Sequence, residues 1–240
     1  MYAREVFLFG DSIARGIMLD TNGSYKPFAD CFAVRTADEL GYQLINKARF
    51  GCTISKGLEI IKRSILKLGN APHNLEPKKL AFLEFGGNDC DFRWEEVAAH
   101  PQAEHLPNTP PEQFRELYCE SIEILRGKGY TPVLLTLPPL NAERYFDWFT
   151  RTGLDRSAIL DWLGDIQFIY RWHESYSNSI WQIGKHEDCV VLDIRSAFLK
   201  RRAYDNLLCR DGIHPNTAGH ELIKLEILEY ANGVRGMPKQ

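Results

Sequence analysis

The sequence of 240 residues lacks an excess of charge of either sign, a long apolar run and any closely spaced pair of cysteines. Its 29 Lys and Arg residues nearly balance 32 Asp and Glu residues, so the composition gives no electrostatic reason to expect nucleic acid or an anionic membrane as a partner. No apolar run approaches the roughly 18 residues that a membrane-spanning helix needs. The first residues show no basic segment followed by a long apolar one, so we see no signal peptide and expect a cytoplasmic protein.

The six cysteines lie at least 20 positions apart, which argues against a disulfide framework and against a zinc site. They are Cys31, Cys52, Cys90, Cys119, Cys189 and Cys209. Apolar residues make up 44% and charged residues 25%, as in ordinary globular proteins. A chain of this length buries roughly 70–75% of the surface that its unfolded form exposes, so it needs no covalent or metal cross-link. We expect one domain over residues 1–240, without a metal or an organic cofactor.

Short, continuously apolar runs alternate with longer helical patterns along the chain. The runs that we interpret as strands are 6–9, 42–46, 80–85, 132–136 and 190–193. The stretches that we interpret as helices are 29–40, 53–68, 109–126, about 155–185 and the segment from about 216 onward, whereas 89–108 follows neither period. This alternation predicts an α/β fold: a three-layer sandwich in which helices cover both faces of a five-stranded parallel sheet of flavodoxin-like topology.

Polar residues follow the first predicted strand directly. In a parallel sheet, functional groups gather in the loops beyond the carboxyl ends of the strands, and Gly10, Asp11 and Ser12 lie at such an end. A serine at this turn exposes its hydroxyl and its own backbone N–H, which suits a nucleophile and an oxyanion-binding site. Asp11 or Ser12 can equally serve as an ordinary helix N-cap, so this cluster alone leaves both interpretations open.

The third predicted strand is followed by a second cluster, in which Gly86 and Gly87 precede Asn88 and Asp89. Glycines let a backbone turn tightly and approach a ligand closely, and the amide of Asn88 can donate a hydrogen bond into the same space. The alternative interpretation is an ordinary glycine-rich turn.

The third cluster, Asp211 and His214, stands just before the last predicted helix. General-base catalysis by histidine needs a carboxylate on one ring nitrogen so that the other nitrogen is free to take a proton. Gly212 and Pro215 favour a loop over a helix here, and a loop can bring the carboxylate and the imidazole together. A lone histidine near a helix start is more often a surface residue, but the neighbouring aspartate favours catalysis.

These clusters, in this order and at these strand ends, together resemble the SGNH (GDSL-type) hydrolase family from Gly10 to Pro215. The matching blocks are Gly10-Asp11-Ser12-Ile13, Gly51 after the second strand, Gly86-Gly87-Asn88-Asp89, and Asp211 with His214. The last two blocks are the most specific, and the first has Ile13 where leucine is commonest in the family. The resemblance implies an SGNH-type fold and a serine ester hydrolase that acts on carboxylic acyl esters without a cofactor.

By this resemblance, Ser12 is the nucleophile, His214 the general base and Asp211 the group that orients the histidine. The oxyanion would be bound by the backbone N–H groups of Ser12 and Gly51 and by the side-chain amide of Asn88. The implied reaction is acyl transfer to water in two steps, with a small-molecule ester as the partner. An acyltransferase or a thioesterase would use the same triad, and a non-catalytic binding protein on this fold is a further alternative.

Three other α/β families fit the residues less well. A haloacid-dehalogenase-type phosphatase would need an acidic residue where Ile13 stands. A phosphate-binding or dinucleotide-binding loop would need a glycine fingerprint that Gly10 and Gly16 do not supply. A flavodoxin-like binding domain would leave the pair of Asp211 and His214 without a purpose.

Aromatic residues concentrate after the fourth predicted strand, where we expect a helical insertion at about 140–186 that holds four of the five tryptophans. These rings either pack a helix onto the sheet or form a lid, an acyl-binding wall, a sugar-stacking surface or a dimer surface. We predict that Asp11, Trp148 and Trp172 contact the substrate, and that the ester has a small acyl group or is linked to a carbohydrate. The sequence leaves open whether the chain forms a homo-oligomer.

Overall fold

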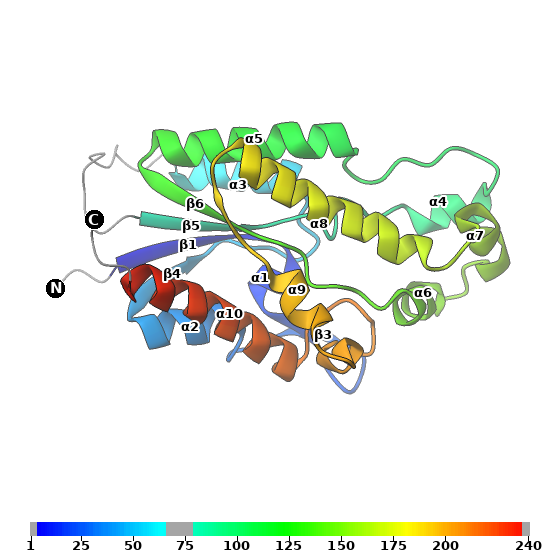
Figure 1. Cartoon of the computed structure of the whole chain (residues 1–240). Coiled ribbons are helices and arrows are strands. Elements are labelled where there is room, and N and C mark those ends of the chain that lie inside the picture. The colour runs from blue at the N-terminus through cyan, green and yellow to red at the C-terminus, as the bar shows by residue number, and fades with distance from the viewer. Residues whose placement is uncertain (1–3, 66–78, 237–240) are drawn as a thin grey trace.

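A parallel sheet of five strands runs through the centre of the computed structural model, which describes residues 4–65 and 79–236 (Figure 1). In their order across the sheet the strands are β4 (Tyr42–Asn46), β1 (Arg4–Gly10), β5 (Lys79–Glu84), β6 (Tyr130–Leu135) and β7 (Val190–Leu192). All neighbouring strands are parallel. The strand order reverses its direction between β1 and β5, and such a switch point is where α/β proteins bind their ligands.

Strand β1 shows why helices cover both faces of the sheet. Successive side chains of a strand point to opposite faces, so Phe7 and Phe9 face one layer and Leu8 faces the other. All three side chains are 3% exposed or less. A strand that is apolar on both sides can only be stable between two helical layers.

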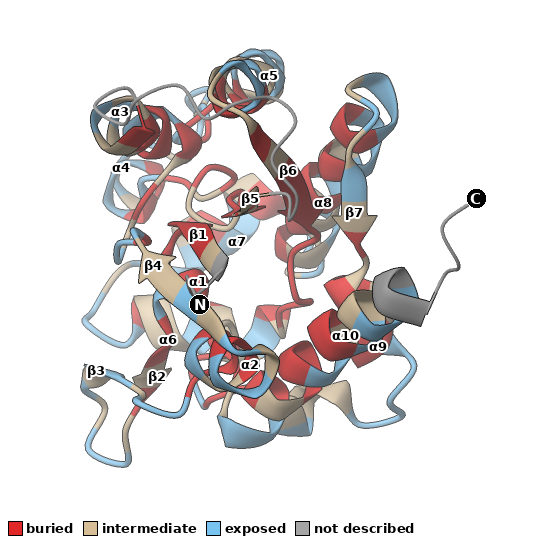
Figure 2. Ribbon diagram, turned by 90° about the vertical axis from the view of Figure 1, so that its left-hand side faces the viewer, coloured by how far each residue is buried: buried red, intermediate tan, exposed pale blue. Residues whose placement is uncertain are grey.

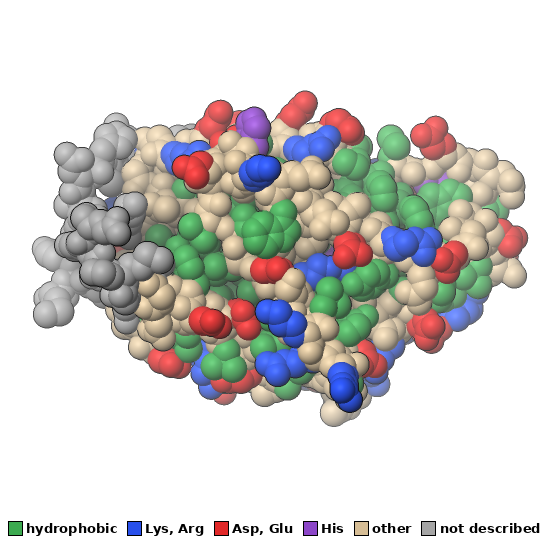
Figure 3. Space-filling view, in the orientation of Figure 1, with side chains coloured by type: hydrophobic (Ala, Val, Ile, Leu, Met, Phe, Trp, Pro, Cys, Tyr) green, Lys and Arg blue, Asp and Glu red, His purple; other side chains and the backbone are tan. Residues whose placement is uncertain are grey.

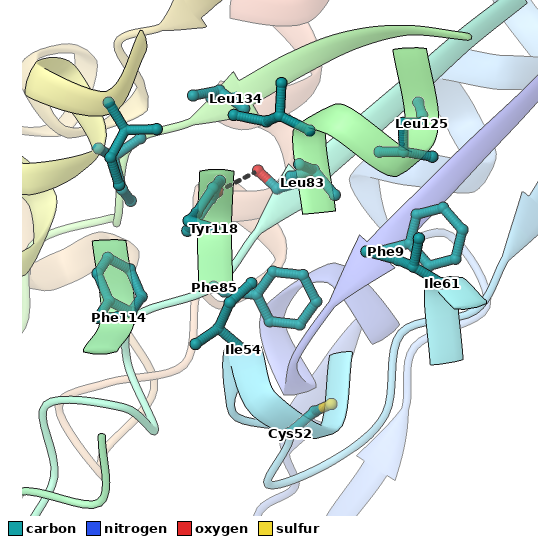
Figure 4. Packing of buried hydrophobic residues seen from close by; sticks show 14 of the residues in the cluster. Phe9, Cys52, Ile54, Ile61, Leu83, Phe85, Phe114, Tyr118, Leu125 and Leu134 are labelled. Carbon is teal, nitrogen blue, oxygen red and sulfur yellow. Dashed lines mark hydrogen bonds between the residues drawn. The ribbon is translucent and has the colours of Figure 1, made fainter. Parts of the chain in front are cut away.

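The first layer covers the face of Phe7 and Phe9 (Figure 2). Its helices are α3 (Ile54–Ile65), α5 (Pro111–Gly127) and α8 (Phe168–His186). Figure 4 shows the packing of α3 and α5 on the sheet, with the Tyr118 hydroxyl donating a hydrogen bond of 3.2 Å to the backbone oxygen of Leu83. The buried hydroxyl is thereby satisfied, and the layer holds the loops at the ends of β1 and β5 in place.

The second layer covers the opposite face, where Leu8 packs (Figure 2). Its helices are α2 (Phe32–Leu40), α9 (Ile194–Leu199) and α10 (Thr217–Gly236). Helix α10 begins after Asn216, whose side chain accepts hydrogen bonds from the N–H groups of Ala218 and Gly219. These hydrogen bonds hold the first turn of α10 to the residue that precedes it.

A third apolar cluster lies beyond the carboxyl ends of the strands (Figure 1). It joins the first turns of α8 to α4 (Trp94–Ala99), α6 (Ala142–Thr150) and α7 (Arg156–Leu163). The short helix α1 (Ser12–Arg15), the antiparallel hairpin of β2 (Ile17–Leu19) and β3 (Tyr25–Pro27), and a 3₁₀ turn at Tyr204–Leu207 complete the described elements.

The predicted fold class is confirmed, whereas several element boundaries differ. The helix expected over 29–40 begins at Phe32, because residues 28–31 form a turn closed by the Cys31 N–H on the Phe28 oxygen. It ends before Gly41, whose φ of 68° closes the helix in the left-handed region. Of the helix expected over 53–68, residues 54–65 are helical, and 66–68 lie outside the described residues.

The expectation for one segment beyond the strands needs correction: the stretch 89–108 is not irregular throughout, because α4 buries Trp94 and Val97 against the third cluster. The segment 155–185 is helical, as expected, with a break: Gly164, with a φ of 68°, ends α7 before α8 begins. The expected insertion at about 140–186 thus corresponds to α6, α7 and α8, and its assignment within one domain stays a prediction.

The surface carries charges of both signs. Figure 3 shows acidic and basic side chains interspersed with hydrophobic ones over the face seen in Figure 1. Among the helices of residues 4–65 and 79–236, none is both long enough and apolar enough to cross a membrane.

Candidate active site

Ser12 stands at the sharp turn where β1 ends and α1 begins. Its turn is held by the Asp11 carboxylate, which accepts a hydrogen bond of 2.8 Å from the Ile13 N–H. Glycine is required at position 10, on the strand side of the turn, because a Cβ there would lie 2.5 Å from the backbone oxygen of Glu84 and 2.6 Å from the Ala14 Cβ. The short helix and its close packing on β5 therefore fix the direction of the serine side chain.

The structure brings Ser12 together with the two residues from the other end of the chain. The His214 Nε2 atom lies 2.8 Å from the Ser12 Oγ, and the His214 Nδ1 atom lies 2.7 Å from the Asp211 Oδ2. All three side chains are less than one-tenth exposed. This chain of hydrogen bonds is the arrangement in which an imidazole can take a proton from a serine hydroxyl.

The loop that carries Asp211 and His214 is held by its own hydrogen bonds. The second carboxylate oxygen of Asp211 accepts from the N–H groups of Ile213 and His214, at 3.1 and 3.2 Å. Gly212 has a φ of 77°, and a Cβ there would lie 2.7 Å from the Asn141 oxygen. As the sequence predicted, the pair lies in a loop.

The environment of Asp211 keeps its carboxyl ionised. Burial by itself raises the pKa of this group, but the hydrogen bonds and the charge interaction with His214, together with the two backbone donors, outweigh burial. The pKa of Asp211 therefore lies below its usual value, and a carboxylate faces the imidazole at neutral pH.

Asn88, which follows β5, is tied directly to the serine turn. Its Nδ2 atom donates a hydrogen bond of 2.9 Å to the second carboxylate oxygen of Asp11. Asp11 is 2% exposed, so its carboxylate links the two loops from within. Its predicted contact with substrate stays a prediction, and the structure shows it holding both Asn88 and the turn of Ser12.

A second carboxyl, Glu84, lies beneath the serine turn. Its Oε2 atom accepts a hydrogen bond of 3.2 Å from the Ala14 N–H. Burial, and next the negative charge of Asp11, raise the pKa of Glu84 well above its usual value. Burial also raises the pKa of Asp11, against the hydrogen bonds from Ile13 and Asn88. We conclude that Glu84 is the neutral member of this pair.

Asp89, the residue after Asn88, also links neighbouring segments through its buried carboxyl group. Its Oδ1 atom accepts hydrogen bonds from the Ile54 N–H at 2.9 Å and from the Thr109 hydroxyl at 2.7 Å. Burial raises the pKa of Asp89 to about 7. The glycine-rich block is therefore an anchored loop that connects α3, β5 and the segment before α5.

Gly51 lies in the loop after β4 with a φ of 66°, in the left-handed region that favours glycine. The preceding residue, Phe50, lines the cavity next to Ser12 and lies over the His214 ring, with the ring centroids 6.2 Å apart. The loop of Gly51 thus borders the site, and the role of its N–H in binding an oxyanion stays a prediction.

A cavity of about 380 Å³ opens beside Ser12 and Asn88. Trp148 and Trp172, which the sequence analysis singled out, both line it, as do Asp11 and His214. We use the name aromatic wall for the six rings on its far side, Phe92, Trp94, Tyr145, Phe149, Phe168 and Trp172. These rings contact one another in an unbroken network, with centroid separations from 4.3 to 5.9 Å.

The GDSL-like Lipase/Acylhydrolase family matches residues 8–222, a span that contains Ser12, Asn88, Asp211 and His214. The chain belongs to this family. Membership agrees with the resemblance found in the sequence and makes the protein an ester hydrolase of the GDSL type.

Two solved structures and one curated relative are similar to this chain. The lipase/acylhydrolase from Enterococcus faecalis is 23% identical, with a TM-score of 0.62 over 99% of both chains. An acetylxylan esterase from Geobacillus stearothermophilus is 15% identical, with a TM-score of 0.62 over 94% of this chain and 93% of its own. The uncharacterized lipoprotein YqeF of Bacillus subtilis is 24% identical over 222 residues, which cover 90% of this chain and 82% of YqeF. The two structures share the fold.

Sequence reasoning about this GDSL family member singled out Trp148 but missed the neighbouring ring of Tyr25. Tyr25 on β3 packs against the His214 ring at 4.9 Å and the Trp148 ring at 6.1 Å. A signal was present, because Asn22 and Gly23 form the kind of dipeptide that closes a hairpin. The wall residues on and before α4 were missed because the stretch 89–108 lacks a clear helical period.

A group of potential metal ligands lies on a different part of the hydrolase. Cys119, His186 and Glu187 place their ligand atoms within 4.8 Å of one another, on α5 and at the end of α8. The Arg126 guanidinium already donates to Glu187 Oε2 at 3.3 Å and to Cys189 Sγ at 3.3 Å. This group does not border the cavity beside Ser12.

Proposed function

We propose that this GDSL family member is a serine carboxylesterase in which Ser12, His214 and Asp211 form the catalytic triad. The observation that carries the proposal is the continuous pair of hydrogen bonds, 2.8 Å from Ser12 to His214 and 2.7 Å from His214 to Asp211. Through them His214 accepts the serine proton as the hydroxyl attacks the ester carbonyl. The Asp211 carboxylate stabilises the imidazolium that forms.

The oxyanion of the tetrahedral intermediate is stabilised by the side-chain amide of Asn88 and by the backbone N–H groups of Ser12 and Gly51. An amide nitrogen has two N–H groups. Asp11 accepts from the amide of Asn88, which lines the cavity, so the second N–H of this amide serves the oxyanion. Donors that are already oriented stabilise developing charge without reorganising during the reaction.

The second half of the reaction returns the enzyme to its resting state. His214 gives its proton to the departing alcohol, which leaves the acyl group bonded to Ser12 Oγ. A water molecule then attacks this ester while His214 accepts a proton from it, and His214 returns that proton to Ser12 Oγ as the carboxylic acid is released. An acyltransferase would replace the water with an acceptor alcohol, and a thioesterase would release a thiol, both on the same triad.

The predicted carbohydrate link of the ester concerns the alcohol side of the site. Tyr25, Phe50 and Trp148 surround the His214 edge of the cavity, and flat aromatic rings suit sugar rings. We propose a small-molecule ester with such an alcohol as the substrate. The cytoplasmic location and the absence of nucleic-acid and membrane partners stay predictions.

Labelling with a fluorophosphonate, combined with hydrolysis of p-nitrophenyl esters, acetylated sugars and acyl thioesters, tests this function. The wild-type protein is expected to be labelled and to hydrolyse oxygen esters, and Ser12→Ala is expected to lose both properties. Ser157→Ala, which removes an exposed serine from α7, is the matched control and should keep both. Equal labelling of Ser12→Ala and wild type would contradict the assignment of the nucleophile.

A further inference from the structure

The inner part of the cavity beside Ser12 is apolar. Besides the aromatic wall, it is lined by aliphatic side chains, namely Leu140, Leu163, Ile169 and Ile213. The innermost of these residues are well enclosed, with Trp94 and Ile169 at 6% exposure and Phe92 and Leu163 at 8%. A pocket of this size and lining binds the apolar part of a small molecule rather than water or an ion.

The polar atoms of the aromatic wall are paired within the protein. The Trp172 indole N–H donates to the Cys90 oxygen at 2.9 Å. The Trp94 indole N–H and the Tyr145 hydroxyl both donate to the Asp91 carboxylate, each at 2.8 Å. Asp91 also lines the cavity, but both of its carboxylate oxygens accept hydrogen bonds from wall residues, and the paired rings present their carbon surfaces to the cavity.

Among the buried titratable residues of the lining, His173 is uncharged. Its Nδ1 atom lies 3.3 Å from the guanidinium of Arg195, and burial lowers the pKa of His173 well below its usual value. The remaining charged lining residues, Glu95 and Arg151, are exposed at the entrance. An occupant of the inner cavity thus meets apolar surface on most sides.

The proposed mechanism decides which part of the ester enters this cavity. The departing alcohol takes its proton from His214 Nε2, so the alcohol lies at the edge of the site formed by His214, Tyr25 and Phe50. Phe50 is 56% exposed, so this edge is open to solvent and lets the alcohol leave. The acyl group stays bonded to Ser12 during the reaction and points away from His214, toward Asn88 and the aromatic wall.

We propose that the inner cavity binds the acyl group of the substrate, and that this group is apolar and considerably larger than acetyl. The inference rests on the proposed serine esterase function and names its acyl substrate class as medium-chain or aryl. It departs from the small acyl group expected from the sequence, because neither the volume nor the apolar lining of the cavity was visible there. Acetyl esters would leave the aromatic wall uncovered.

A p-nitrophenyl ester series from acetyl to dodecanoyl tests the inference on the wild-type protein. Burial of each methylene contributes about 0.8 kcal/mol, which is about fourfold in kcat/KM. We therefore expect kcat/KM to rise about fourfold per methylene until the cavity is full and then to level or fall. A maximum at acetyl, with a fall at every longer chain, would overturn the inference and leave the serine mechanism intact.

Substitutions on α7 test whether the acyl preference arises from binding in this cavity. Leu163→Phe adds a ring to the lining and should lower the decanoyl-to-acetyl ratio of kcat/KM by at least about tenfold. Leu160→Phe makes the same change on the exposed side of α7 and should keep the wild-type ratio. If both variants keep the wild-type ratio, the acyl group does not enter this cavity. Leu163→Met is the milder variant if Leu163→Phe does not fold, and its ratio should also change.

Equilibrium binding separates this inference from the catalytic proposal. In Ser12→Ala, decanoate is expected to bind saturably by calorimetry and to change the tryptophan fluorescence of the wall, whereas acetate at equal concentration is not. Leu163→Phe in the same background should weaken decanoate binding. Saturable decanoate binding by Ser12→Ala, together with no Ser12-dependent hydrolysis, would refute the esterase proposal and support the acyl-binding role of the cavity. Ser12-dependent hydrolysis without decanoate binding would support the esterase proposal and refute the acyl-binding role.

Discussion

Two regions that meet at Ser12 are built in different ways. We use the name strand-end loops for three short segments beside Ser12, namely 10–16 after β1, 86–91 after β5, and 208–215 before α10. Buried carboxyl groups hold them by accepting hydrogen bonds: Asp11 and Asp211 accept from backbone N–H groups beside them, and Asp89 accepts from that of Ile54. The aromatic wall is instead assembled from rings on α4, α6 and α8 and from the segment before α4. The loops place single atoms at hydrogen-bonding distance from one another, whereas the wall shapes a volume. In the proposed mechanism, chemistry and acyl selection depend on separate parts of the chain, and substitutions should separate them.

The largest effect is expected from a change within the strand-end loops. Asp211→Asn keeps the shape of the side chain and removes the charge that stabilises the imidazolium, so kcat should fall on the order of 10⁴-fold for acyl esters of every length. Steady-state kinetics across the ester series measures this fall. A loss confined to one chain length would break the separation between the two regions.

Asn88→Ala should have the next largest effect. Removal of one oxyanion donor costs on the order of 10²–10³ in kcat, and KM should change much less because the donor acts mainly in the transition state. The comparison is sharpened by Asp11→Asn, which disturbs Asn88 through the 2.9 Å hydrogen bond and should lower kcat by a smaller factor. An effect of Asn88→Ala mainly on KM would contradict the oxyanion role.

Acid should lower the free energy of unfolding of the protein. Burial lowers the pKa of His220 from 6.5 to about 4, and its ring packs between Phe28 and Phe32 at 5.6 and 5.8 Å. Below pH 6.5 the unfolded chain binds a proton at His220, whereas the folded protein binds this proton only below about pH 4. The free energy of unfolding should therefore fall by up to about 3 kcal/mol across this window and not depend on this group above it.

Urea unfolding at pH 7.5 and pH 5 measures this loss of stability. His220→Phe should reduce the difference between the two pH values, although His173, whose pKa burial also lowers, should retain part of it. An unchanged pH dependence in His220→Phe would show that this imidazole is not the group that titrates.

The smallest effect is expected at the mouth of the cavity. Trp148 lies beneath Arg151, whose guanidinium is 3.7 Å from the ring centre, and beside Tyr25. Trp148→Ala should raise KM for esters of sugar alcohols by about 2- to 10-fold and leave the order of acyl chain lengths unchanged. Trp181→Ala, on the exposed side of α8, is the control. A changed acyl preference in Trp148→Ala would place the acyl group at the mouth.

The strand-end loops could be predicted because each block is recognisable within a few residues. Gly10, Asp11 and Ser12 follow an apolar strand, and Asp211 and His214 are three residues apart in a loop, so local spacing carried the information. The parallel sheet then required the ends of β1 and β5 to meet. Even so, the hydrogen bond between Asn88 and Asp11 was missed, because it joins residues 77 positions apart and no local pattern records it.

The sequence by itself determined the α/β class and the family's motif blocks, which hold the groups that we propose react, because strand periodicity and short hydrogen-bonded turns are local properties. Only the tertiary structure decided that the rings of α4, α6 and α8 enclose a cavity, that Tyr25 covers His214, and that Glu84 lies buried beneath the serine turn. These features arise from packing between segments distant in the chain. Volume and burial exist only once those segments have come together.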